Sequence, residues 1–149
     1  MWGKPLIIRF FLYLKNRNKA PYAVTKSGCR SGIMEAGKRA DAIISQKRLW
    51  LNPDFTLKQL ARESGSNRTY ISKYISKEKG CCFREYINTY RTEHAFDLIR
   101  AGKQKTMADV AMLSGFGSVR SFRSSFIKRY GFTPLDMIKS SSTPESGCE

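Results

Sequence analysis

Arginine, lysine, serine and threonine residues gather in two stretches of the sequence, residues 67–79 and 118–129. Arg120 and Arg123 are three positions apart, so on a helix they would share one face, about one turn apart. An arginine can donate two parallel hydrogen bonds to guanine, a serine or threonine hydroxyl can bond to several base edges, and a valine or threonine methyl can pack against thymine. In this arrangement these residue types suit contact with base edges in the major groove of double-stranded DNA.

Residue types that bind phosphate lie in the same two stretches. Asn67 and Ser118 each stand where a helix can begin, and the N–H groups at a helix N-terminus bind phosphate oxygens. Nearby basic side chains could add positive charge: Lys77, Lys79, Lys105, Lys128 and Arg129. Any one of these residues could instead be a solvated surface residue, so the elements that hold them decide the interpretation.

The second stretch follows the start and end signals of a short helix. Thr106 with Asp109 forms a variant of the capping box that starts helices, and Gly115 can supply the positive φ with which helices commonly end. Ser118 can then cap a second helix. A short helix, a glycine turn and a second helix with a basic side predict a helix-turn-helix.

Apolar residues four positions apart set the inward face of each predicted second helix. These residues are Ile71 and Ile75 in the first helix and Phe122 and Phe126 in the second. The other positions face outward: Arg68, Thr69, Tyr70, Ser72 and Lys73 in the first helix, and Val119, Arg120, Ser121, Arg123 and Ser124 in the second.

The helix-turn-helix pattern occurs twice, at about residues 56–79 and 106–130. Core and cap positions that begin with Thr56 recur fifty residues later as Thr106, Met107, Val110, Ala111, Ser114 and Gly115. Beyond the turn the offset is fifty-one, so that Asn67 matches Ser118 and the second copy has one extra residue in its turn. The repeat predicts two helix-turn-helix units without reference to any other protein.

Residues 83–101 join the two copies, with apolar residues at helical spacing and Gly102 at the end. At ~1.5 Å per residue this helix would span roughly 28 Å, close to the ~34 Å between successive major-groove entries on one face of B-DNA. One chain could therefore read two grooves. With further helices at 36–51 and 135–139, the prediction is an all-α fold of seven helices between residues 36 and 139.

Three short motifs carry a resemblance to a known family. They are Gly115–Phe116, Ser121–Phe122, and the pattern F-x-x-x-x-G-x-T-P from Phe126 to Pro134. These motifs resemble the AraC/XylS family of bacterial transcription regulators, and the match covers about residues 36–139. The resemblance implies a double helix-turn-helix DNA-binding domain that touches RNA polymerase, as family members do, and a regulator that acts as an activator.

The resemblance also implies which residues touch DNA. It places base contacts near the N-terminal half of each second helix, which maps onto Thr69, Ser72, Lys73, Val119, Arg120, Arg123 and Ser124. The residues expected to contact phosphate are Asn67, Arg68, Tyr70, Lys77, Ser118, Ser121, Lys128 and Arg129.

Composition excludes several other classes of function. The formal net charge of +15, from 27 Lys plus Arg against 12 Asp plus Glu, favours a partner that carries phosphates. No carboxylate pair, nucleophile or phosphate-cradling loop predicts catalysis, and no cofactor or small-molecule ligand is indicated. The four cysteines and single histidine form no zinc motif. We expect reduced thiols in a cytoplasmic, nucleoid-associated protein, with redox sensing at Cys81 and Cys82 a minor alternative.

The two ends of the sequence differ from the central part. Residues 1–35 carry seven basic residues and one acid, and are expected to form a poorly ordered extension. They are too few for the ligand-sensing domain usual in the family. Residues 140–149 are polar and are expected to be a disordered tail.

Three functions remain as alternatives. The first is a sequence-specific regulator that, if the chain is complete, binds an asymmetric site as a monomer. The second is the DNA-binding fragment of a larger membrane-tethered or sensor-linked signalling regulator, with Leu6–Leu14 as the stub of a truncated span. The third is a non-specific coat on nucleic acid.

Overall fold

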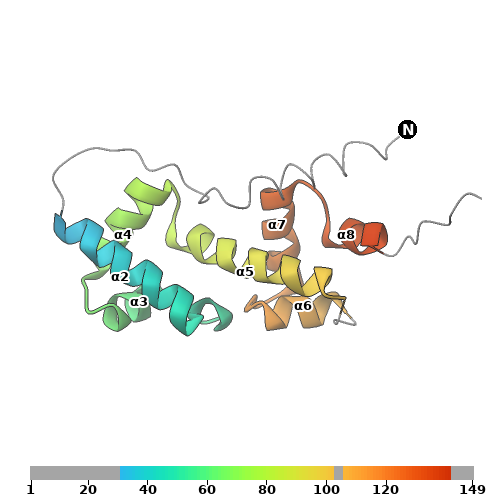
Figure 1. Ribbon diagram of the computed structural model, residues 1–149, viewed down its shortest axis with the longest axis horizontal. Coiled ribbons are helices and arrows are strands. Elements are labelled where there is room, and N and C mark those ends of the chain that lie inside the picture. Colours follow the sequence, from blue (N-terminus) through green and yellow to red (C-terminus); the bar gives the residue numbers. More distant parts are fainter. Residues whose placement is uncertain (1–30, 103–105, 142–149) are drawn as a thin grey trace, which may run out of the picture. The chain divides into compact units, whose positions relative to one another are not determined.

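The computed structural model describes residues 31–102 and 106–141, which contain seven α-helices and no strand (Figure 1). The predicted all-α fold is therefore confirmed. The described residues divide into two compact units. Unit 1 contains residues 31–49 and 55–86, and unit 2 contains residues 50–54, 87–102 and 106–141.

Some of the predictions concern residues that lie outside the described ranges. These residues are the apolar run Leu6–Leu14, most of the basic extension, Lys105 and the end of the tail.

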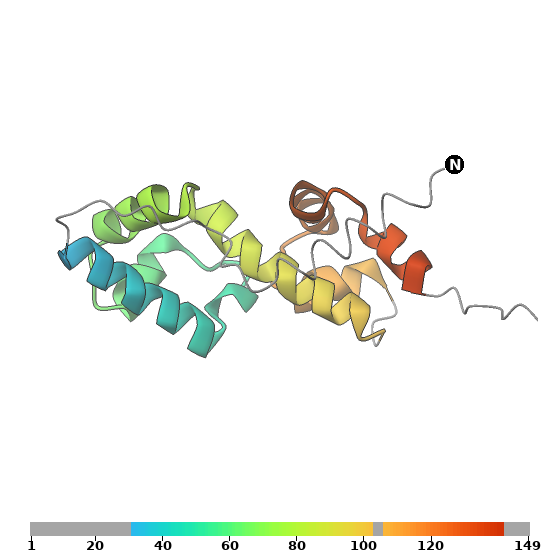
Figure 2. The same ribbon diagram turned by 45° about the horizontal axis from the view of Figure 1, so that its top comes forward.

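Unit 1 is built from helix α2 (Ser31–Lys47), α3 (Leu57–Glu63) and α4 (Arg68–Tyr74), with a π-helical turn η2 (Ile75–Lys79) directly after α4. The first residues of α5 (Phe83–Arg100) complete it. Each of α2, α3 and α4 packs against the other two, as Figure 2 shows. The helix-turn-helix of this unit consists of α3 and α4.

The core of unit 1 follows the helical period of the sequence. Ala36, Ala40 and Ile44 recur every four residues on α2 and are at most 2% exposed. Leu60 of α3 and Ile71 of α4 are fully buried. Small residues on α2 let the helix-turn-helix approach it closely.

Unit 2 contains the rest of α5, α6 (Met107–Leu113), α7 (Val119–Tyr130) and α8 (Pro134–Ser141), together with part of the 3₁₀ turn η1 (Leu49–Leu51). Its helix-turn-helix consists of α6 and α7 (Figure 1).

An aromatic cluster fills the core of unit 2, and Phe126 of α7 is at its centre. The centroid of the Phe126 ring lies 4.7 Å from that of Tyr130, 5.6 Å from Phe122, 5.8 Å from Phe132 and 6.3 Å from Phe96. Aromatic pairs at such distances add to the stabilisation that burial alone provides. One face of α7 is thereby fixed against the core.

The predicted helix starts are confirmed. Thr106 and Asp109 form a capping box, with the Asp109 N–H donating to Thr106 Oγ1 at 3.1 Å and the Thr106 N–H donating to Asp109 Oδ2 at 3.1 Å. Asn67 caps α4 and Ser118 caps α7 through their side chains. The turn between α6 and α7 is one residue longer than the turn between α3 and α4, as the change of offset in the repeat requires.

Three boundaries differ from the prediction. The first helix begins at Ser31 rather than at 36, so residues 31–35 belong to α2 and not to the extension. It ends at Lys47, because Arg48 has a positive φ of 47°, and the chain continues into η1. The last helix extends to Ser141, two residues into the predicted tail. Spacing of apolar residues locates the last helix but does not mark the two polar residues, Ser140 and Ser141, that extend it.

The segment Trp50–Asp54 is held in unit 2 by a buried arginine. Arg91 of α5 is 9% exposed, its Nε donates to the carbonyl oxygen of Trp50 at 2.8 Å, and its Nη2 donates to the carbonyl oxygen of Asn52 at 2.8 Å. Burial lowers the pKa of the Arg91 guanidinium. The Trp50 carbonyl in turn lies close to Gly115, in the turn between α6 and α7.

Gly115 and Gly65 provide a matched test of this packing. Both follow the first helix of their helix-turn-helix motif and have a positive φ, of 78° at Gly115 and 58° at Gly65. A Cβ on Gly115 would lie 2.4 Å from the Trp50 carbonyl oxygen, whereas a Cβ on Gly65 would meet nothing within 4 Å. We expect Gly65→Ala to lower the free energy of unfolding by about 1 kcal/mol through backbone strain, and Gly115→Ala by about 3 kcal/mol through strain and overpacking. Urea unfolding followed by circular dichroism measures both, and equal losses would contradict the close approach at Gly115.

Candidate nucleic-acid interface

The first recognition surface is the side of α4 that faces away from the core of unit 1. Thr69, Ser72 and Lys73 are exposed, whereas Ile71 and Tyr74 are buried. Because successive helix residues are about 100° apart, burial of these two residues turns the polar residues outward. The three predicted base-reading residues of the first unit therefore share one open face.

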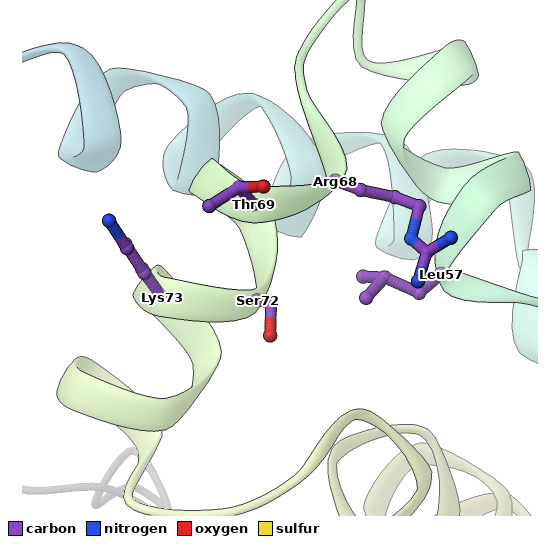
Figure 3. Close-up of a pocket in the computed structure, with 5 residues that line it drawn as sticks. All are labelled: Leu57, Arg68, Thr69, Ser72 and Lys73. Carbon is purple, nitrogen blue, oxygen red and sulfur yellow. The ribbon is translucent and has the colours of Figure 1, made fainter.

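A shallow hollow of about 530 Å³ lies in front of this face. It is lined by Leu57, Arg68, Thr69, Ser72 and Lys73 (Figure 3). Figure 3 shows Thr69, Ser72 and Lys73 projecting from α4, and Arg68 extending from the start of α4 on the side of Leu57 in α3. Two cationic groups and two hydroxyl groups therefore meet around one concave surface.

Leu57 is the apolar residue that lines the hollow. Helical spacing with Leu60 and Ala61 would turn its side chain toward the core, but it is half-buried. Leu57 is the first residue of α3, at the edge of the helix bundle. Periodicity alone cannot separate such an edge position from a core position.

The second recognition surface is the outward side of α7. Arg120, Arg123 and Ser124 are exposed and Val119 is half-buried. Phe122 and Phe126, on the opposite side, are fully buried. Arg120 and Arg123 are about one turn apart on one face, so both guanidinium groups reach the same side of α7, as the sequence predicted.

The helix starts offer fewer N–H groups than the sequence suggested. The N–H of Thr69 donates to Asn67 Oδ1 at 2.7 Å, and the N–H of Ser121 donates to Ser118 Oγ at 3.2 Å. The capping side chains therefore satisfy donors that a phosphate would otherwise use. The first N–H groups of α4 and α7, at Arg68 and Val119, have no acceptor within their own helix and remain suited to a phosphate.

Most predicted phosphate contacts lie on the surface. The exposed residues of this set are Asn67, Arg68, Tyr70, Lys77, Ser118, Ser121 and Lys128. Arg129 differs, because its Nη2 forms an ion pair with Glu93 Oε1 of α5 and its guanidinium lies 5.8 Å from the Tyr130 ring centroid. Its charge is used within unit 2, so we assign Arg129 to the packing of α7 on α5.

These observations define the class of the protein. Each unit contains a helix-turn-helix whose second helix turns cationic and hydroxyl side chains to solvent. The chain is therefore a double helix-turn-helix protein.

Comparison with known proteins identifies the family. A family described as "Helix-turn-helix domain" matches residues 60–140. The probable transcription factor PqrA of Proteus vulgaris is 24% identical over 115 residues, which cover 73% of this chain and 93% of PqrA. An uncharacterized HTH-type transcriptional regulator of Staphylococcus aureus (strain MSSA476) is 33% identical over 79 residues, which cover 52% of this chain but 10% of that regulator.

Solved structures show the same fold. A transcriptional regulator from Chromobacterium violaceum, described as containing an AraC-type DNA-binding domain, aligns with a TM-score of 0.62 at 16% identity, over 77% of this chain and 99% of that chain. The chain belongs to the AraC-type helix-turn-helix family, and it is a DNA-binding transcription regulator rather than an enzyme. None of the helices in the described part of the chain has the length and apolar character needed to cross a membrane.

Lys128 and Arg129, neighbours on α7, provide a test of the electrostatic assignment. Lys128→Ala is expected to reduce the slope of log K against log salt by about one, because one phosphate contact is lost. Arg129→Ala is expected to leave that slope nearly unchanged and to lower the free energy of unfolding by roughly 1 kcal/mol, since its partly exposed ion pair is lost. DNA titrations at several salt concentrations, with urea unfolding of each variant, distinguish the two. An equal fall in slope for both variants would show that Arg129 also reaches the DNA.

Proposed function

We propose that the protein is a sequence-specific transcription regulator that inserts α4 and α7 into two successive major grooves. The observation that supports this most directly is the division of each helix into a buried apolar side and an exposed side of arginine, lysine and hydroxyl groups. The base-reading residues in this proposal are Thr69, Ser72 and Lys73 of α4, and Val119, Arg120, Arg123 and Ser124 of α7.

The two recognition helices lie in one chain, and this favours binding by a single copy. Helix α5, which joins the two helix-turn-helix motifs along the chain, has 18 residues and is about 27 Å long. That length is comparable to the ~34 Å between groove entries on one face of DNA. The exposed residues of α4 and α7 also differ, so the proposed site has two unlike halves.

An activating role is the direction of regulation that the family resemblance implies. An activator of this kind binds beside a promoter and contacts RNA polymerase. The net charge of +15 favours residence on DNA, which for a bacterial regulator means the nucleoid in the cytoplasm.

Selection of bound duplexes from a random pool tests the proposed mode of binding. We expect an asymmetric site of roughly 16 to 20 base pairs, bound in a one-to-one complex. Sedimentation or native mass spectrometry gives the stoichiometry. A palindromic site bound by two chains would contradict single-copy binding, and no enrichment at all would indicate a non-specific coat on nucleic acid.

Arg123→Ala tests base reading by α7. If Arg123 reads a guanine, the change should cost about 1 to 3 kcal/mol of binding free energy on the selected site and relax the preference at one base position. Arg100→Ala, which removes an exposed arginine from the end of α5, serves as the control of equal charge and should leave the preference intact. Equal weakening of selected and random duplexes by Arg123→Ala would make Arg123 a backbone contact and leave base reading to Arg120.

A further inference from the structure

The ring of Tyr74, at the end of α4, packs against Gly37 of α2. A Cβ on Gly37 would lie 2.1 Å from Cδ2 and 2.2 Å from Cγ of Tyr74, which is closer than real Cβ atoms approach. The absence of a side chain at Gly37 therefore lets the Tyr74 ring lie directly on α2. Tyr74 is the last residue of α4 and is 5% exposed.

One turn further along α2, Asp41 holds the hydroxyl end of that ring. Tyr74 Oη donates to Asp41 Oδ2 at 2.7 Å, and Lys79 Nζ donates to the same oxygen at 2.9 Å. Tyr86 of α5 donates its hydroxyl to Asp41 Oδ1. We call this set the Asp41 cluster, and it consists of Gly37, Asp41, Tyr74, Lys79 and Tyr86.

The Asp41 carboxylate accepts hydrogen bonds from three side chains, those of Tyr74, Lys79 and Tyr86. Asp41 has a side-chain exposure of 28% and Lys79 of 20%. Hydrogen bonds to an ionised carboxylate are directional and stronger than those between neutral groups. Three donors on a single carboxylate therefore restrict where the Tyr74 hydroxyl can be.

Such a restriction matters because Tyr74 lies where the α-helical part of this segment ends and the π-helical turn η2 begins. Side-chain atoms lie roughly 5–6 Å from a helix axis, so a rotation of about 20° moves them by roughly 2 Å, enough to break a hydrogen bond to a base edge. Fully buried Ile71 resists movement away from the core, but a smooth apolar contact tolerates some rotation. The Tyr74 hydroxyl, fixed at a distance from the axis, opposes rotation directly.

Unit 2 ties its recognition helix at the position equivalent to Tyr74. At the offset of fifty-one that holds beyond the turn, Tyr74 corresponds to Ser125. Asn88 Nδ2 of α5 donates to Ser125 Oγ of α7 at 3.2 Å. Both units therefore connect the same place on the recognition helix to the helix before the motif, by different side chains.

We propose that the Asp41 cluster is a positioning site that sets the rotation of α4 and thereby determines which bases the first half-site prefers. Tyr74, Asp41 and Gly37 are positioning residues in this account, because they act through Ser72 and Lys73 rather than touching DNA. The inference rests on the proposed function, since it requires that α4 reads bases.

The test compares the two halves of the site selected by the wild-type protein. Ser72→Ala and Arg123→Ala first assign base positions to α4 and to α7. Tyr74→Phe keeps the ring in place on Gly37 but removes the hydroxyl, and Asp41→Asn removes the charge that the donors share. Tyr130→Phe removes the hydroxyl of a buried tyrosine in unit 2 and serves as the matched control.

We expect Tyr74→Phe and Asp41→Asn to reduce discrimination at the positions read by α4 by roughly fivefold or more, which is within the range of one good base contact. In these two variants, discrimination at the positions read by α7 should stay within about twofold of wild type. Tyr130→Phe should leave discrimination at the positions read by α4 within about twofold of wild type. Gly37→Ala, which displaces the ring, should act in the same direction as Tyr74→Phe.

Two results would overturn the inference. One is an equal loss of affinity for all duplexes together with a lower unfolding midpoint, which would make the Asp41 cluster a source of stability only. The other is unchanged discrimination in the folded Tyr74→Phe and Asp41→Asn proteins. If the wild-type protein selects no sequence at all, the proposed function itself fails, and this outcome is seen before any variant is made.

Discussion

Burial of one side of each recognition helix is the constraint on which the interface depends. A helix has one orientation in which its apolar residues reach the core, and that orientation also decides which polar residues reach solvent. In α7, Phe122 and Phe126 are fully buried among aromatic rings. This burial places Arg120 and Arg123 on the exposed side of α7. The position of the arginines is thus a consequence of packing energy rather than of any contact that they make themselves.

The two units apply this constraint with different side chains. Unit 1 uses smaller aliphatic residues, Ile71 and Ile75, and adds a polar tie at Tyr74. Unit 2 uses phenylalanine on a helix of 12 residues and a weaker tie at Ser125. Larger aromatic side chains bury more area and resist rotation without a strong polar anchor. The two units therefore fix the orientation of their recognition helices by different side chains. The residues on the exposed faces of α4 and α7 differ as well.

Local signals in the sequence were sufficient for the helices and their caps. Thr106 and Asp109 lie within one helical turn, so their reciprocal hydrogen bonds follow from residue type and spacing alone. The repeat added the second motif and the longer turn. The start of α2 at Ser31 was missed, because Ser31 is followed by Gly32, a poor helix former, although Ile33 and Met34 continue the apolar spacing of Ala36 and Ala40.

Contacts between distant residues could not be predicted in the same way. Asp41 and Tyr74 are 33 positions apart, and Arg129 and Glu93 are 36 apart. Nothing in the sequence near Arg129 indicates that it pairs with Glu93 of α5. The outward faces were therefore predictable as sets of residues, whereas the role of each member depends on tertiary packing.

A crystal structure of the protein bound to its selected duplex tests the central claim most directly. We expect α4 and α7 to lie in two successive major grooves, with Ser72 or Thr69 and at least one of Arg120 and Arg123 within hydrogen-bonding distance of base edges. A complex in which both helices lie along the phosphate backbone, or in which α3 or α6 enters the groove instead, would contradict the account.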